Sequence, residues 1–181
     1  MPGRIDETRP FVPLRIAVLT VSDTRTTADD RSGDTLSDRI VAAGHQLVDR
    51  DIVRDDRAAI ADRLRRWIAD PGVEVVITTG GTGVTGRDVT PEALADVAEK
   101  HIAGFGELFR MLSYAKIGTS SLQSRADAAV AGGTYLFCLP GSPGACRDGW
   151  DEILRFQLDI RHRPCNFAEL LPRLSEHERR G

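Results

Sequence analysis

The sequence predicts an α/β fold in which a mostly parallel sheet is covered by helices on both faces. Several apolar runs of strand length, such as residues 16–21, lack the polar alternation of half-exposed strands. These runs alternate along the chain with segments whose apolar residues recur at helical spacing. A length of 181 residues, 41% of them hydrophobic, suits one globular domain around a single core.

The chain begins with two strands joined by a helix. Residues 16–21 (IAVLTV) are predicted to form a buried strand that opens into the polar loop 22–25. Residues 47–53 are predicted to form the next strand. The helix between them has an apolar face and a glycine where a left-handed end is expected, at Leu36, Ile40, Ala43 and Gly44.

A second helix and a third strand follow. Asp55 and Asp56 stand in helix-capping position, and the helix ends before Pro71 and Gly72. Residues 73–79 form the third strand, which is apolar until two threonines at its carboxyl end. The apolar face of the helix comprises Ile60, Leu64, Trp67 and Ile68.

The second half predicts three helical segments, a fourth strand over residues 134–139 and a last helix. The last helix is marked by Trp150, Ile153 and Leu154. Three glycines, Gly104, Gly106 and Gly118, are expected to separate the three segments. Helical spacing defines these segments at Leu94, Val97 and Ala98, at Leu108, Phe109 and Leu112, and at Leu122, Ala126 and Ala129.

Charge and cysteine content exclude several classes of protein. A net charge of −3 argues against a nucleic-acid partner, because such domains usually carry a basic surplus. The three cysteines are odd in number and lack CxxC spacing, which disfavours both a disulfide framework and a zinc knuckle. The apolar runs are too short for a membrane helix. We therefore expect a cytoplasmic protein with no membrane contact.

Three polar loops follow predicted strands, at residues 22–25, 80–89 and 140–144. Ligands of open parallel sheets bind outside the carboxyl ends of the strands, where the winding direction reverses. The topology therefore predicts that these loops converge on one site. Asp23 and Arg25 in the first loop suit either anion binding or an ordinary surface turn.

The middle loop is the most informative segment. Residues 80–93 read GGTGVTGRDVTPEA, and the bare backbone of the glycines exposes N–H groups that suit a phosphate. Thr90 is expected as the N-cap and Pro91 as the first residue of a helix whose dipole favours an anion. The alternative is a plain turn, but such turns need about 2–6 residues and this one spans roughly ten.

Two familiar fingerprints match this loop only in part. Residues 81–86 read GTGVTG, yet a dinucleotide site would open its helix directly after that motif. A phosphate-binding P-loop would need lysine where Arg87 and Asp88 stand. An acidic side chain beside a phosphate suits a bound Mg²⁺, and Asp55 is the natural second carboxylate. The alternative for Asp55 is a simple helix cap.

Linked sequence blocks resemble the MoaB/MogA family of molybdenum cofactor biosynthesis. The blocks are TTGGTG at 78–83, GRDVTPEA at 86–93, TVSDTR at 20–25, GFGELFRMLS at 104–113 and LPGSPGA at 139–145. The resemblance covers about residues 14–167, flanked by an N-terminal extension at 1–13 and a C-terminal tail at 168–181. IGTSSLQSRA at 117–126 and RPCNF at 163–167 resemble the MoaB branch more closely.

This resemblance implies a three-layer α/β/α sandwich around a doubly wound sheet, in a homo-oligomer that is a trimer or a hexamer. It implies transfer of AMP from Mg-ATP to the phosphate of molybdopterin, with release of pyrophosphate. The alternative is a non-catalytic member that carries or delivers the pterin in a larger assembly. A molybdenum-insertion protein is an expected partner.

The resemblance also implies roles for individual residues. Asp55 and Asp88 would be catalytic and would hold Mg²⁺ through the nucleotide. The nucleotide phosphates would contact Thr79, Gly80, Gly81, Thr82 and Gly83. The pterin side would comprise Ser22, Asp23, Ser113, Pro140, Gly141 and Ser142.

Overall fold

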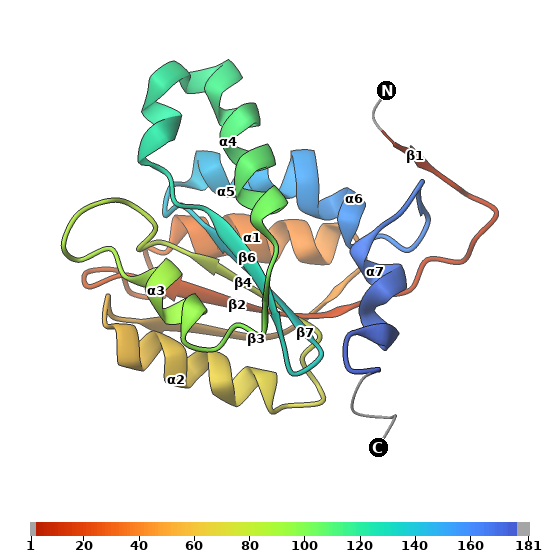
Figure 1. Ribbon diagram of the computed structural model, residues 1–181, viewed down its shortest axis with the longest axis horizontal. Helices are drawn as coiled ribbons and strands as arrows, with labels where there is room; N and C mark the ends of the chain where they lie inside the picture. Colours follow the sequence, from red (N-terminus) through yellow and green to blue (C-terminus); the bar gives the residue numbers. More distant parts are fainter. Residues whose placement is uncertain (1–2, 177–181) are drawn as a thin grey trace.

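A six-stranded, mostly parallel sheet forms the centre of the molecule in the computed structural model, which describes residues 3–176 (Figure 1). Four strands run parallel, and β6 and β5 extend the sheet in antiparallel pairs. In spatial order the strands are β3 (Gln46–Val53), β2 (Arg15–Val21), β4 (Val75–Thr79), β7 (Thr134–Leu139), β6 (Asp127–Ala131) and β5 (Lys100–His101).

Helices cover both faces of this sheet, which confirms the three-layer α/β/α architecture (Figure 1). One face packs against α2 (Arg57–Ile68) and α3 (Thr90–Ala95). The opposite face packs against α1 (Arg31–Ala42), α4 (Ala103–Ile117), α5 (Pro143–Gly149) and α7 (Phe167–Leu170), and the short α6 (Arg155–Gln157), which has no buried residue, follows on the same side (Figure 1). A 3₁₀ segment, η1 (Gly118–Gln123), follows α4, and a π-helical turn, η2 (Trp150–Leu154), joins α5 to α6.

Burial explains the apolar strands. Every residue of β4 and β7 is buried, because each strand has a strand on both sides and helices on both faces. Gly44 ends α1 with a φ of 88°, as predicted for a left-handed helix end. All three cysteines are free thiols. No helix in the part of the chain that the structure describes is both long and apolar enough to cross a membrane.

The predicted helix at Leu122, Ala126 and Ala129 is wrong. Leu122 lies in η1, while Ala129 lies in β6, which pairs with β7 as a hairpin. Gly132 and Gly133 form the turn with φ values of 54° and 82°, a conformation that favours glycine and fits a tight hairpin. Alanine spacing alone did not distinguish a small-residue strand from a helix.

Two glycines predicted to separate helices lie inside one. Gly104 and Gly106 belong to α4. A Cβ at Gly106 would lie 2.2 Å from the carbonyl oxygen of Ala126, so this glycine permits close packing of α4 against the segment before β6. The prediction was wrong for Gly106 because this glycine serves a tertiary contact, whereas no atom lies within 4 Å of a Cβ placed at Gly104.

The ends of the described chain pack against the domain. β1 (Arg4–Ile5) pairs antiparallel with β8 (His162–Arg163). Ala168 is buried in the same apolar layer as α1 and α4, and Leu171 and Leu174 pack against that layer. Part of the segment assigned above to the C-terminal tail thus belongs to the core, and residues 177–181 lie outside the described residues.

Candidate functional site

A cavity of about 630 Å³ opens at the carboxyl ends of the central parallel strands. β2 pairs with β3 on one side and β4 on the other, so the order of the strands reverses beside β2. The three loops predicted to converge, 22–25, 80–89 and 140–144, all contribute to the cavity wall. The predicted convergence is therefore confirmed.

Most of the predicted site residues line this cavity. They are Ser22, Asp55, Gly80, Gly81, Thr82, Gly83, Asp88, Ser113, Pro140, Gly141 and Ser142. Thr79 and Asp23 do not line it. Thr79 is buried and donates to the carbonyl oxygen of Pro140 at 3.0 Å, so it supports the third loop from below. Asp23 lines an adjacent groove and pairs with Arg87.

Two glycines allow the middle loop to pass close to the end of β2. Gly80 has a φ of 103°, and a Cβ there would lie 2.2 Å from the carbonyl oxygen of Val21. Gly81 has a φ of 64°, and its Cβ would meet the hydroxyl of Thr90 at 2.3 Å. Only glycine adopts both backbone conformations without a clash.

Thr90 fastens this loop to α3, but it is not the N-cap that the sequence predicted. Val89 occupies the cap position, and no side chain caps the helix. The buried Thr90 hydroxyl donates instead to the carbonyl oxygen of Gly80 at 2.8 Å, and the Thr90 amide donates to that of Gly81 at 3.0 Å. The hydrogen bond from the Thr90 hydroxyl to the loop takes the place of an N-cap bond within α3. The first residue of the helix is therefore bonded to Gly80 and Gly81.

Asp88 lies against the amides of its own loop. Its carboxylate accepts hydrogen bonds from the Thr85 amide at 2.8 Å and the Thr85 hydroxyl at 2.6 Å. Burial alone would raise the pKa of Asp88, but these bonds and the Gly83 amide lower it below its usual value. The amides of this loop thus donate to a carboxylate of the loop itself, and phosphate binding by the loop stays a prediction.

Asp55 faces the cavity and does not cap α2. The cap is Asp56, whose carboxylate accepts from the Ala59 amide at 2.8 Å. Burial and the negative charges of Asp23 and Asp88 raise the pKa of Asp55. Asp55 therefore lies in an acidic environment that a cation would stabilise.

The donors in the cavity suit Mg²⁺ shared with a nucleotide. Among the described residues, no group of three or more His, Cys, Asp or Glu side chains is placed to hold a metal ion. Mg²⁺ is commonly bound by one or two carboxylates, with phosphates and waters completing its shell. Asp55 and Asp88 supply two such carboxylates, and the pKa of Asp55 is raised first by burial and then by the negative charges of Asp23 and Asp88, with Arg87 acting in the opposite direction.

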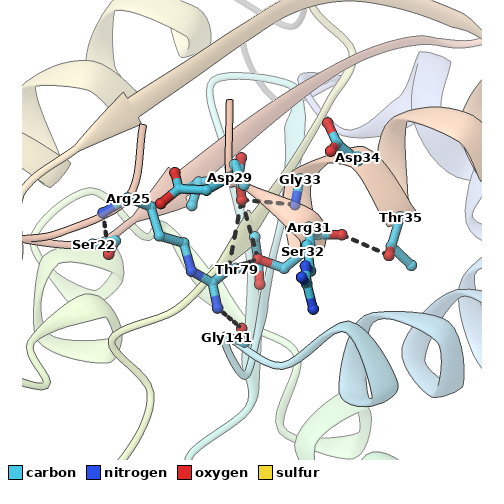
Figure 2. A network of polar contacts seen from close by, with 12 residues as sticks. Ser22, Arg25, Asp29, Arg31, Ser32, Gly33, Asp34, Thr35, Thr79 and Gly141 are labelled. Carbon is cyan, nitrogen blue, oxygen red and sulfur yellow. Dashed lines mark hydrogen bonds and ion pairs between the residues drawn. The ribbon is translucent and has the colours of Figure 1, made fainter. Parts of the chain in front are cut away.

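A buried network holds Arg25 at the cavity (Figure 2). Arg25 donates to the carbonyl oxygen of Gly141 at 2.9 Å and also bonds Ser32, so it connects the first and third loops. Asp30 is fully buried and lies 3.6 Å from the Arg25 guanidinium. Hydrogen bonds from Thr20, Arg50 and the Gly33 amide lower the pKa of Asp30 against the opposing effect of burial.

Apart from Ser113, the sequence did not predict the wall formed by α4 and η1. Lys116 lines the cavity and donates to Asp148 of α5 at 2.6 Å, across the two helices. The available signal was the polar stretch after Gly118, which follows an apolar helix. The remaining members of this wall are Phe109, Ile117, Ser120, Ser121, Gln123 and Ser124.

Comparison with known proteins points to one family. Residues 17–160 match the family model described as "Probable molybdopterin binding domain". Molybdenum cofactor biosynthesis protein B of Escherichia coli K12 is 53% identical over 157 residues, which cover 87% of this chain and 92% of that protein. The Bacillus cereus protein of the same name is 42% identical over 142 residues, covering 78% and 84% of the two chains.

Solved structures agree with this result. A crystal structure of a molybdenum cofactor biosynthesis protein B superposes with a TM-score of 0.84 at 37% identity, covering 93% of this chain and 99% of the other. The tungsten cofactor synthesizing protein MoaB from Pyrococcus furiosus superposes with a TM-score of 0.70 at 34% identity, covering 78% and 91%. The chain therefore belongs to the MoaB/MogA family of molybdenum cofactor biosynthesis proteins.

Proposed function

We propose that this protein acts in molybdenum cofactor biosynthesis by transferring AMP from Mg-ATP to the terminal phosphate of molybdopterin. The observation that carries the proposal is the placement of Asp55, Asp88 and the glycine-rich loop on one cavity. An oxygen of the pterin phosphate attacks the α-phosphorus of ATP. The bond to the bridging oxygen breaks, and pyrophosphate leaves with the electron pair.

The residues of the cavity suit such a reaction because nucleotidyl transfer depends on positioning and charge stabilisation. Asp55 and Asp88 would hold Mg²⁺ through their carboxylates, and the ion would neutralise phosphate charge when bound. Arg25 and Lys116 place two positive charges on the cavity wall. The amides of Gly81 and Thr82, which have no acceptor among the described residues, would bind phosphate oxygens, while those of Gly83 and Thr85 donate to Asp88.

The apolar and hydroxyl side chains of α4 and η1 suit the pterin. Phe109 and Ile117 offer apolar surface, and Ser113, Ser121 and Ser124 offer hydroxyl groups. Ligand sites typically combine an apolar wall with a few polar groups that fix orientation. We assign this wall, with the loop 140–144, to the pterin, and the glycine-rich loop to the nucleotide.

The proposed reaction is tested with purified protein, molybdopterin and ATP labelled at the α-phosphate, with and without Mg²⁺. We expect the label to move to the pterin, with equimolar release of pyrophosphate, and only when Mg²⁺ is present. Tight binding of molybdopterin with no transfer of label would overturn the enzymatic proposal and favour a carrier of the pterin.

We propose that the active species is a homo-oligomer, a trimer or a hexamer, that delivers its product to a molybdenum-insertion partner. Large apolar side chains that are exposed in the isolated chain support self-association, because contiguous apolar surface commonly marks an interface. Five such side chains lie on α4 and η1: Leu108, Met111, Tyr114, Ile117 and Leu122.

A further inference from the structure

Arg125 contacts the glycine-rich loop at three points from a distant part of the sequence. Its amide donates to the carbonyl oxygen of Thr82 at 2.9 Å. Its guanidinium donates to the carbonyl oxygens of Gly83 at 2.6 Å and Asp88 at 2.8 Å. The two guanidinium bonds span the loop from its beginning to its end. One side chain therefore fixes the separation of the two halves of the loop.

Glu92 orients this guanidinium. Arg125 donates to both carboxylate oxygens of Glu92, one of them at 3.2 Å, in a bidentate pair. The pKa of Glu92 is lowered, mainly by its hydrogen bond from Arg125. Glu92 lies in the first turn of α3, immediately after the Thr90 bonds that hold Gly80 and Gly81. The pair thus links the loop to the helix that follows it.

The direction of these bonds sets the direction of the loop amides. In a planar trans peptide the carbonyl and the following N–H point in opposite directions. The carbonyls of Thr82, Gly83 and Asp88 all point towards Arg125, so the amides that follow them, those of Gly83, Val84 and Val89, point away from it, and the Gly83 amide is one that donates to Asp88. Arg125 and Glu92 are not among the described residues that line the cavity. They act on the cavity only through the loop.

We propose that Arg125 and Glu92 are a positioning pair that holds the glycine-rich loop in the form that binds nucleotide phosphate. This inference rests on the proposed function for the identity of the ligand, a nucleoside triphosphate with Mg²⁺. The guanidinium occupies the loop carbonyls, which would otherwise be free to turn towards the phosphate and repel it. The same guanidinium fixes the position of the Asp88 backbone, because the Asp88 carbonyl oxygen is one of its acceptors.

The test compares Arg125→Ala with Arg57→Ala as a matched control. Arg57 also forms a bidentate pair with a carboxylate next to α3, that of Asp96, with one bond at 2.7 Å, but within the described part of the chain its side chain makes no hydrogen bond to the loop. Hydrogen–deuterium exchange is measured at the loop amides that are bonded in the structure, those of Thr85, Asp88 and Thr90. Mg-ATP binding is measured by calorimetry on the same samples.

We expect Arg125→Ala to speed exchange at these amides and to weaken Mg-ATP binding, each by about tenfold or more, since hydrogen bonds to charged groups are lost. Arg57→Ala should leave both unchanged. Arg125→Lys should restore neither slow exchange nor Mg-ATP binding, because an ammonium cannot bridge two carbonyls and a carboxylate as the planar guanidinium does. In the transfer assay, Arg125→Ala should raise the KM for ATP more than it lowers kcat.

Unchanged loop exchange in Arg125→Ala, or exchange that rises equally throughout the sheet, would overturn the positioning role. Full rescue of Mg-ATP binding by Arg125→Lys would overturn it as well. A wild-type protein that fails to transfer AMP would refute the proposed function. Hydrogen–deuterium exchange at the loop amides does not depend on turnover, so it would still decide the role of Arg125.

Discussion

Asp55 and Asp56 are adjacent in the sequence and have different surroundings. Asp56 is exposed and caps α2, while Asp55 is half-buried and lines the cavity. The sequence left open whether Asp55 is a cap or a site residue, because both carboxylates precede the same helix. The structure resolves the ambiguity, since a helix N-terminus accepts one side-chain cap and Asp56 supplies it.

Asp30 stabilises the fold through its ionised form. The pKa of Asp30 is lowered in the folded state. Its contribution to the free energy of unfolding is therefore fully present above the unfolded pKa and is lost as pH falls through the folded pKa. Asp30→Asn should lower the free energy of unfolding by about 2–4 kcal/mol at neutral pH, because Arg50 and Arg25 lose a buried counter-charge.

Urea unfolding at several pH values measures this effect. The difference between wild type and Asp30→Asn should shrink as pH falls below about 4, where the Asp30 carboxylate of the unfolded chain begins to protonate, and should vanish as pH falls through the lower folded pKa. Asp34→Asn is the control, because Asp34 pairs with the same Arg50 at 2.7 Å but is largely exposed. It should change stability by no more than about 0.5 kcal/mol. An equal loss in both variants would refute the role of Asp30.

At the scale of elements, the glycine-rich loop depends on glycine at some positions and not at others. Gly80→Ala should lower the free energy of unfolding by more than about 2 kcal/mol, because of its positive φ and the contact of the new Cβ with Val21. Gly86 lies in the same loop with no atom near the place of a Cβ. Gly86→Ala should therefore be neutral within about 0.5 kcal/mol.

Thermal unfolding and Mg-ATP binding distinguish these two alanine variants. The account requires Gly80→Ala to lose both stability and nucleotide affinity, while Gly86→Ala keeps both. If Gly86→Ala lowered stability and nucleotide affinity as much as Gly80→Ala, the losses would come from reduced backbone flexibility of the whole loop. The close approach of Gly80 to β2 would then not be their cause.

Elements with strong periodicity were predicted correctly, and those defined by distant contacts were not. β2, β4 and β7 are continuous apolar runs, and burial on both faces leaves that pattern in the sequence. β6 is rich in alanine and owes its conformation to the hairpin with β7. Its pattern therefore resembled a helix.

At the scale of the whole molecule, the reversal of strand order beside β2 determined where the site lies. The sequence predicted which loops would meet there, because each follows a recognisable strand. It did not predict that Lys116 and η1 close the cavity or that Arg125 reaches the loop, since these depend on how α4 and the segment before β6 pack. Long-range packing of this kind has no local sequence signal.

The most direct test of the central claim compares AMP transfer by Asp55→Asn with that by Asp56→Asn. The two variants remove the same charge one residue apart, and asparagine keeps the cap at position 56. We expect Asp55→Asn to lower the transfer rate by about 10²-fold, as loss of a charged group acting in the transition state does, and Asp56→Asn to retain nearly the wild-type rate. Equal rates in the two variants would contradict the assignment of Asp55 to the reaction.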